Sequence, residues 1–328
     1  AEALTLRSLL DEAGVPRPAG EPSGRAPRVL TWLLPVMDPA RAAAQDSPLR
    51  AALAADLDLS VSSLSQLDAL LAAVRAQGIP ARLHLKVDTG MSRGGAMEED
   101  LPALAAALKR AVDEGTVDVV GLWSHLSRAD EPTSGSTEEH LVRYRQAERI
   151  VREAGLTPSI HHLAATGGLL WHPEARMDLV RAGIGLYGLS PAPSVTTGAE
   201  LGLRPAMRLE SELVQVKRID VGQAVSYGGT WSAPTDRWVG LVPLGYSDGV
   251  PRAASSTGPV GIGGMMTAIV GRVCMDQVVI DLGPAQDETG SSLPAPAQVG
   301  DTAVLWGAPD ALGQEAVPTV DELSLIHI

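Results

Sequence analysis

The segment HLKVDTGMSRGG, residues 84–95, carries charged side chains where an apolar run ends. The run Leu83–Val87 predicts a buried strand, and Lys86, Asp88 and Arg93 lie at its end or just beyond it. Charged groups at the carboxyl end of a buried strand are costly unless they are paired or functional. In a β/α barrel this end of the strands is also where active sites are built. The segment therefore predicts a site, with a local ion pair at a turn as the alternative.

Polar groups follow three later apolar runs in the same way. His125 and Asp130 stand in WSHLSRADEP, and His162 and Thr166 stand in HHLAATGG. Arg181 stands in DLVRAGIGLYG. Either histidine alone would more often be a hydrogen-bonded residue of a core or rim. Because consecutive strands of a barrel bring their ends to one mouth, the four ends together predict a site there.

The residue types at this mouth indicate an anionic ligand. Thr166 precedes a Gly-Gly pair and offers a hydroxyl and backbone N–H groups at a helix start, which suits a phosphate. Gly183 allows close backbone approach on the neighbouring run. Arg181 lies in an otherwise apolar run and needs an acceptor, such as an anion or a ring nitrogen. A buried ion pair with Asp178 is the alternative for this arginine.

Three segments further along interrupt strand-like runs with polar or aromatic residues beside Gly or Asp. They are VSYGGTW (225–231), PLGYSDGVPR (243–252) and GRVCMDQ (271–277). Tyr227 could act as an acid or base where nearby cations stabilise its phenolate. A tyrosine at a strand end is more often a packed side chain whose hydroxyl is satisfied.

Short apolar runs alternate with helical patterns over residues 1–198, which predicts β/α units around a parallel sheet. The predicted strands are Val29–Leu34, Leu57–Val61, Leu83–Val87, Val117–Trp123, Ile160–Leu163 and Leu179–Leu186. The predicted helices are Glu2–Ala13, Leu64–Gln77, Leu101–Val112 and Glu138–Ala154. A closed barrel needs more steps than these, so we expect a partial (β/α)8 TIM barrel whose first two strands are missing. An open doubly wound sheet is the competing fold, but no Gly-rich phosphate fingerprint follows any strand.

Over residues 199–328 the helical periodicity largely vanishes, which predicts a smaller, all-β domain. Its predicted strands are Leu213–Ile219, Trp238–Leu244, Ala268–Val273, Val278–Leu282 and Ala303–Trp306. The fold class is therefore α/β followed by all-β.

Composition narrows the function. The single cysteine excludes an internal disulfide and fits a reducing compartment, so we expect a cytoplasmic protein. No apolar run is long enough to span a bilayer, and a net charge of -13 without a basic run argues against nucleic acid or an anionic membrane as partner. The only lysines are Lys86, Lys109 and Lys217, which matters because some chemistries need an amine.

Six of these motifs, in this order and approximate spacing, resemble the alanine racemase family. They are KVDTGMSR, WSH with ADE, DLVRAGIGLYGLSP, VSYGGTW, GYSDG and GRVCMDQ. One such motif is weak, but six in order across two domains are highly specific. The resemblance implies an isomerase that interconverts L- and D-alanine through an aldimine of pyridoxal 5'-phosphate and supplies D-alanine for peptidoglycan. It also implies a homodimer, arranged head to tail, whose active site is shared between subunits.

On this resemblance, four residues surround the cofactor ring. Arg93 matches an arginine near the phenolic oxygen and the substrate carboxylate, and Lys86 matches a lysine that is carbamylated in many members. His125 matches a histidine near the pyridine ring, and Arg181 matches the arginine that hydrogen-bonds the ring nitrogen. Because a guanidinium keeps its proton, it leaves that nitrogen unprotonated and weakens the cofactor as an electron sink.

The resemblance also assigns the phosphate, the substrate and one base. The phosphate contacts match Thr166, Gly183 and Ile184. Tyr227 matches the base that takes the α-proton of the L-enantiomer, and it acts in the site of the partner subunit. Met275 matches a backbone contact to substrate, with Asp276 adjacent. The substrate entrance matches Asp130, Tyr246, Arg252 and Arg272.

The sequence departs from the family at three places. The cofactor-bearing lysine, which is the second base, has no match, because Lys86 is already assigned, Lys109 falls in an outer helix pattern and Lys217 in the β domain. A closing segment that brings another tyrosine to the phosphate is also absent. The family's Asn-Ser reads Ala165-Thr166, which keeps the hydroxyl and loses the amide. We therefore expect a chain truncated at its N-terminus and also at its C-terminus, and nearly inactive as printed.

Two other functions remain open. One is a metal-dependent amidohydrolase barrel, with carbamylated Lys86 bridging two metals and His125 and His162 as ligands. This reading leaves the β-domain motifs unexplained. The other is a non-catalytic relative that binds pyridoxal phosphate, although a single-domain barrel would lack the domain that holds Tyr227 and Met275.

Overall fold

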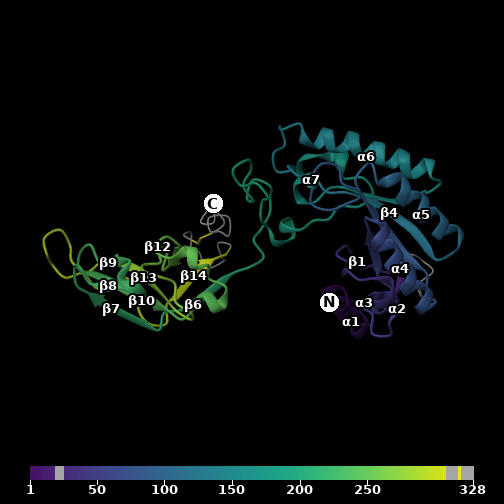
Figure 1. The fold of residues 1–328 in the computed structure, drawn as a ribbon. Helices are drawn as coiled ribbons and strands as arrows, with labels where there is room; N and C mark the ends of the chain where they lie inside the picture. Colours follow the sequence, from purple (N-terminus) through teal and green to yellow (C-terminus); the bar gives the residue numbers. More distant parts are fainter. Residues whose placement is uncertain (19–25, 308–316, 319–328) are drawn as a thin grey trace. The chain divides into compact units, whose positions relative to one another are not determined.

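The computed structural model describes residues 1–18, 26–307 and 317–318. The chain divides into two compact units, Ala1–Ala182 and Gly183–Ile328, which we call the α/β unit and the β unit. Both are visible in Figure 1. No helix in the described ranges is long and apolar enough to cross a membrane.

The α/β unit is built on a five-stranded parallel sheet whose spatial order follows the chain. Its strands are β1 (Leu30–Thr31), β2 (Asp58–Val61), β3 (Ala81–Lys86), β4 (Val117–Trp123) and β5 (Ile160–His162). Its α-helices are α1 (Glu2–Glu12), α2 (Pro39–Ala43), α3 (Pro48–Ala54), α4 (Leu64–Gln77), α5 (Leu101–Asp113), α6 (Ser136–Glu153) and α7 (Thr166–Trp171). Sequential parallel strands with helices in the crossovers confirm the predicted partial β/α barrel.

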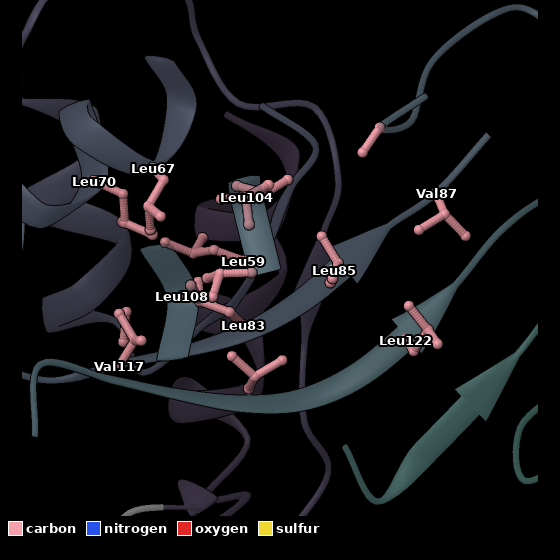
Figure 2. Close-up of a cluster of buried hydrophobic side chains, with 14 of the residues drawn as sticks. Leu59, Leu67, Leu70, Leu83, Leu85, Val87, Leu104, Leu108, Val117 and Leu122 are labelled. Carbon is pink, nitrogen blue, oxygen red and sulfur yellow. The ribbon is translucent and has the colours of Figure 1, made fainter. Parts of the chain in front are cut away.

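The core of this unit lies between the sheet and helices α4 and α5. Figure 2 shows leucines of β2, β3 and β4 packed against leucines of the two helices. The fully buried members are Leu59, Leu67, Leu70, Leu83, Leu85, Leu104, Leu108 and Leu122. Each such side chain stabilises the fold by roughly 1.5–3 kcal/mol relative to an exposed one, so this core holds the strand ends in place.

Helix α4 shows why the local sequence signals succeeded. The Ser63 side chain caps its first turn by accepting a hydrogen bond from Gln66 N at 3.3 Å. Gly78 ends the helix in the left-handed conformation, with φ of 70°. The helix therefore begins and ends at the predicted residues.

The predicted sixth strand, Leu179–Leu186, is wrong. Arg181 N donates to Ala164 O at 2.9 Å, but no ladder forms, and a 3-10 turn occupies Ile184–Tyr187. Glycines at positions 183, 185 and 188 weaken a strand, and Gly188 takes φ of 78°. The residues up to Arg181 therefore run beside β5 and the residues after it as irregular backbone.

The described residues of the β unit form three small antiparallel sheets, ordered β13-β10-β7, β12-β11-β14-β6 and β8-β9. The strands are β6 (Leu209–Glu212), β7 (Gln215–Ile219), β8 (Ala224–Val225), β9 (Trp231–Ser232), β10 (Arg237–Val242), β11 (Pro259–Ile262), β12 (Met265–Ala268), β13 (Val278–Pro284) and β14 (Thr302–Trp306). The predicted run Ala268–Val273 is wrong in extent, because the strand lies earlier and Gly271 turns the chain with φ of 75°. The all-β character of this unit is confirmed.

Candidate active site

Three strand ends of the α/β unit converge around the indole of Trp123, the last residue of β4. The Lys86 ammonium lies 4.6 Å from the centroid of this ring, and the Arg181 guanidinium carbon lies 4.9 Å from it. The His162 imidazole stacks on the same ring with centroids 5.3 Å apart. Trp123 was not predicted to belong to the site, although its place directly before Ser124 and His125 at the end of an apolar run was a usable signal.

Arg181 is held by four hydrogen bonds from its two terminal nitrogens. Nη1 donates to His162 Nδ1 at 2.8 Å, and Nη2 donates to His125 Nδ1 at 3.1 Å. Nη2 also donates to the backbone carbonyls of Ser124 and Leu163, at 2.9 and 3.0 Å. No hydrogen bond from Nε is found among the described residues. The two terminal nitrogens thus hold the guanidinium in place, and the Nε–H remains able to donate a hydrogen bond to a ligand.

The alternative ion pair between Arg181 and Asp178 is not formed. The Asp178 carboxylate instead accepts from His161 N at 2.8 Å and ties the chain beside β5.

Three cations raise the electrostatic potential of this mouth. Burial, then Arg181, Arg93 and Lys86 in that order, lower the pKa of His125 to about 4. Burial, followed by Arg93 and Arg181, also lowers the pKa of Lys86 below its ordinary value. His125 is therefore neutral at physiological pH, and the mouth favours an anionic ligand.

The loop that carries Arg93 is shaped by Asp88. One carboxylate oxygen of Asp88 accepts from the backbone N–H groups of Gly90, Met91 and Ser92, at 2.8, 3.0 and 3.2 Å. The loop then closes where Asp88 N donates to Ala96 O. Asp88 therefore organises the backbone of the loop, which the predicted alternative of a local ion pair did not anticipate.

A buried histidine that the sequence analysis missed fixes the loop around His125. His140 of α6 contacts Thr89 Oγ1 through Nδ1 at 2.7 Å and Ser127 Oγ through Nε2 at 2.9 Å. Thr89 in turn contacts Ser124 Oγ at 2.8 Å. His140 sits in the middle of a helical pattern, so nothing in the sequence marked it as part of the site.

Thr166 is buried and begins α7, as predicted. The two glycines that follow it are required by packing. A Cβ at Gly167 would lie 3.0 Å from the backbone of Ala129, and one at Gly168 would lie 2.7 Å from the Ala164 side chain. They let α7 approach the loop that holds the exposed Asp130. Gly183 and Ile184 are the first residues of the β unit.

The three lysines lie where the sequence placed them. Lys86 ends β3 at the mouth, and Lys109 pairs with Asp113 on the outer surface of α5. Lys217 lies on β7 of the β unit.

The β unit brings its three predicted segments together. Ser226 Oγ donates to Arg272 O at 2.7 Å, which joins the first segment to the third. Tyr246 N donates to Cys274 O at 3.0 Å, which joins the second to the third. The Arg252 guanidinium lies 5.8 Å from the centroid of the Tyr246 ring. Three of the four residues expected at the substrate entrance, Tyr246, Arg252 and Arg272, thus lie in this unit, whereas Asp130 lies in the α/β unit.

This arrangement leaves the side chains of Tyr227 and Met275 exposed to solvent. They are 71% and 59% exposed, and with Ser226 and Asp276 they line a pocket of about 490 Å³. Ser226 takes φ of 62°, a left-handed conformation that is held by its bond to Arg272 O. The Arg272 guanidinium carbon lies 3.4 Å from where a Gly228 Cβ would stand, so a cation lies beside the backbone next to Tyr227.

The residues offered as metal ligands are otherwise engaged. His125 Nδ1 and His162 Nδ1 both accept from Arg181, which places a cation beside both rings. In the described part of the chain no three His, Cys, Asp or Glu side chains cluster as a metal site. The geometry gives the amidohydrolase reading no support.

Comparison with known proteins assigns both units. Residues 38–191 match the family model "Alanine racemase, N-terminal domain", and residues 206–326 match "Alanine racemase, C-terminal domain". Alanine racemase of Salinispora arenicola is 42% identical over 321 residues, which cover 98% of this chain and 75% of the relative. Alanine racemase of Streptomyces coelicolor is 40% identical and covers 98% of this chain and 74% of the relative.

Solved structures agree with the sequence comparison. The alanine racemase structure from Streptomyces coelicolor A3(2) has a TM-score of 0.83 and 39% sequence identity, and the match covers 99% of this chain and 76% of that one. The structure from D-cycloserine-producing Streptomyces lavendulae has a TM-score of 0.80 and 38% identity, covering 93% of this chain and 74% of that one.

Proposed function

The chain belongs to the alanine racemase family, and from this premise we propose that it interconverts L- and D-alanine with pyridoxal 5'-phosphate bound at the mouth of the α/β unit. The observation that carries the proposal is the anchored guanidinium of Arg181. Its terminal nitrogens are engaged by His125, His162 and two carbonyls, which supports an Nε–H directed at a ring nitrogen.

The residues present fit this cofactor. Pyridoxal 5'-phosphate carries an anionic phosphate and a phenolic oxygen, and Lys86, Arg93 and Arg181 supply positive charge, as their effects on the pKa of His125 show. When bound, the cofactor delocalises the electron pair that remains on the α-carbon after its proton is removed. We assign the phosphate to Thr166, Gly183 and Ile184.

Two residues at the mouth would control the ring and the substrate carboxylate. Arg181 would donate a hydrogen bond to the ring nitrogen and keep its own proton, which would leave that nitrogen unprotonated and make the cofactor a weaker electron sink. This favours return of a proton to the α-carbon over side reactions. Arg93 binds the carboxylate of alanine as a charge-assisted pair.

We propose that Lys86 is carbamylated. The lowered pKa of Lys86 increases the fraction of neutral amine, which is the form that adds carbon dioxide, forming an N–C bond and releasing a proton. The product is an anion, which would pair with Arg93 and relieve the repulsion among the three cations. Arg93 would then be held in place by a group of opposite charge.

We assign proton transfer at one face of alanine to Tyr227. Its phenolic oxygen would take the α-proton of L-alanine. We propose a homodimer in which Tyr227 of a second copy serves the mouth described above, with Met275 and Asp276 contacting substrate. Asp130, Tyr246, Arg252 and Arg272 would line the entrance. A cytoplasmic location is proposed from the single cysteine.

Formation of D-alanine from L-alanine tests the proposal. The chain spans about three quarters of the length of the relatives it matches. The assay therefore uses a fusion that adds the residues of the Streptomyces coelicolor relative outside the aligned region. With pyridoxal 5'-phosphate added, we expect D-alanine to accumulate to equal amounts of both enantiomers, as chiral chromatography would show.

The matched control is the same fusion carrying Arg181→Gln, which removes the charged donor and keeps a similar length. It should lose most of the turnover. A folded parent fusion that binds the cofactor and forms no D-alanine would overturn the proposed function.

A further inference from the structure

A buried chain of hydrogen bonds runs from Arg181 through the sheet to Asp58 on β2. His162 Nε2 lies 2.9 Å from His84 Nδ1, and His84 Nε2 lies 3.2 Å from Asp58 Oδ2. His162, His84 and Asp58 are 0%, 2% and 1% exposed. This series of hydrogen bonds therefore connects the mouth to the interior of the α/β unit through side chains that are shielded from solvent.

The backbone is arranged to permit this chain. His84 on β3 must reach past β4 to His162 on β5, and its strand partner on β4 is Gly121. A Cβ at Gly121 would lie only 2.1 Å from His84 Nδ1, so a glycine is required there. The β3–β4 register also shifts between Leu83 and His84. A passage through a strand that depends on one glycine is a specific feature of this sheet.

The two ends of this series of hydrogen bonds, Arg181 and Asp58, allow only one arrangement of protons. A guanidinium only donates, so His162 Nδ1 accepts from Arg181 and the ring proton sits on His162 Nε2. That proton is donated to His84 Nδ1, which places the proton of His84 on Nε2. An ionised carboxylate only accepts, and Asp58 completes the sequence. Both histidines are therefore neutral, and each carries its proton on Nε2.

Asp58 is kept ionised despite its burial. Burial raises its pKa, but hydrogen bonds from His84, Arg28 and Arg82 outweigh this effect, and the pKa lies below its ordinary value. Arg28 Nε donates to Oδ2 and Arg82 Nε donates to Oδ1, both at 2.7 Å. The acceptor end of the chain is thus permanently charged at neutral pH.

We propose that Asp58 is a positioning residue for Arg181. Through His84 and His162 it fixes the acceptor nitrogen that holds the guanidinium, and so sets the direction in which Arg181 presents its remaining N–H to the cofactor ring. The second half of this statement rests on the proposed function, whereas the proton arrangement does not. Asp58 itself touches neither substrate nor cofactor.

Nitrogen-15 spectra of the full 328-residue chain test the proton arrangement directly. We expect His84 and His162 to be neutral, with protons on Nε2, and a scalar coupling across the hydrogen bond from His162 Nε2 to His84 Nδ1. Asp58→Ala removes the acceptor of the His84 Nε2 proton, so the His84 ring should shift and the coupling from His162 Nε2 should be lost. Asp58→Asn should restore the coupling, because an amide oxygen can still accept from His84.

Arg28→Gln is the control variant. It removes the positively charged partner of Asp58 and leaves the hydrogen bond between Asp58 and His84 in place. Its histidine signals should match those of the parent. A proton on His162 Nδ1 in the parent, or an unchanged coupling in Asp58→Ala, would overturn the proposal. The parent spectrum alone decides the first point, even if Asp58→Ala does not fold.

Affinity for pyridoxine 5'-phosphate gives a second readout. This probe has the ring nitrogen and phosphate but no aldehyde, so its binding needs no lysine. We expect about tenfold weaker binding in Asp58→Ala and no change in Arg28→Gln, as measured by calorimetry. His84→Ala should weaken binding to the same extent, and the double variant should add nothing further.

The outcomes separate the two proposals. A parent chain that shows the expected tautomers but does not bind the probe would count against the proposed function. Equal probe affinity in the parent and Asp58→Ala, after loss of the coupling, would overturn the positioning role.

Discussion

Tyr227→Phe is expected to abolish exchange of the α-hydrogen of L-alanine with solvent while exchange of D-alanine continues. The substitution removes only the hydroxyl that we assign as the base for the L-enantiomer. Loss of a general base lowers the turnover of racemisation by about 10²- to 10⁴-fold. The measurement is proton NMR of each enantiomer in heavy water with the fusion described above, which reports the two faces separately.

Tyr187→Phe is the matched control. Tyr187 is also an exposed tyrosine in a short 3-10 turn, and it has no assigned role. It should retain exchange of both enantiomers. Continued exchange of L-alanine in Tyr227→Phe, at the rate of the parent, would show that another group takes this proton.

Mild acid is expected to destabilise the α/β unit because His162 resists protonation. Burial, then Arg181 and His84, lower its pKa to about 2, against an ordinary value of 6.5. Between these two values the unfolded chain binds a proton at His162 that the folded chain does not. Stability is therefore lost as the pH falls, by about 1.4 kcal/mol per pH unit, or roughly 3 kcal/mol by about pH 4.5.

Native-state hydrogen exchange of peptides that contain β3, β4 and β5 measures this loss for the α/β unit alone. His162→Asn is the matched variant, because its amide oxygen can accept from Arg181 in place of Nδ1 and does not titrate. Its stability should fall less steeply with acid than that of the parent. Equal slopes in the two proteins would contradict the assignment of this effect to His162.

Much of the fold could be predicted because its signals are local. Ser63 and Gly78 mark both ends of α4, and β4 begins and ends at the residues expected from its apolar run. The short helices α2 and α3 were missed because each holds too few residues to show a period. The sixth strand was predicted from apolar residues that are in fact partly exposed, since Leu179 and Val180 lie on irregular backbone. Whether such a segment forms a strand depends on its backbone pairing with a neighbouring strand, which its amino-acid composition does not show.

The site was predictable to the extent that its residues follow strand ends. Lys86, His125 and Arg181 were expected at one mouth and are found there. His84 and Asp58 could not be recognised, because a polar residue within a strand carries no sign of which partner it meets across the sheet. Their connection depends on the open space at Gly121 and on the register of β3.

Mixing two inactive variants tests the central claim most directly, namely that Arg181 of one copy and Tyr227 of a second copy serve the same site. Arg181→Gln and Tyr227→Phe fusions are unfolded together, refolded as a mixture and assayed for racemisation. Half of the randomly formed dimers would hold one intact site of two, so we expect about a quarter of the parent activity. Activity no greater than the sum of the separate variants, in a mixture shown to contain mixed dimers, would contradict the account.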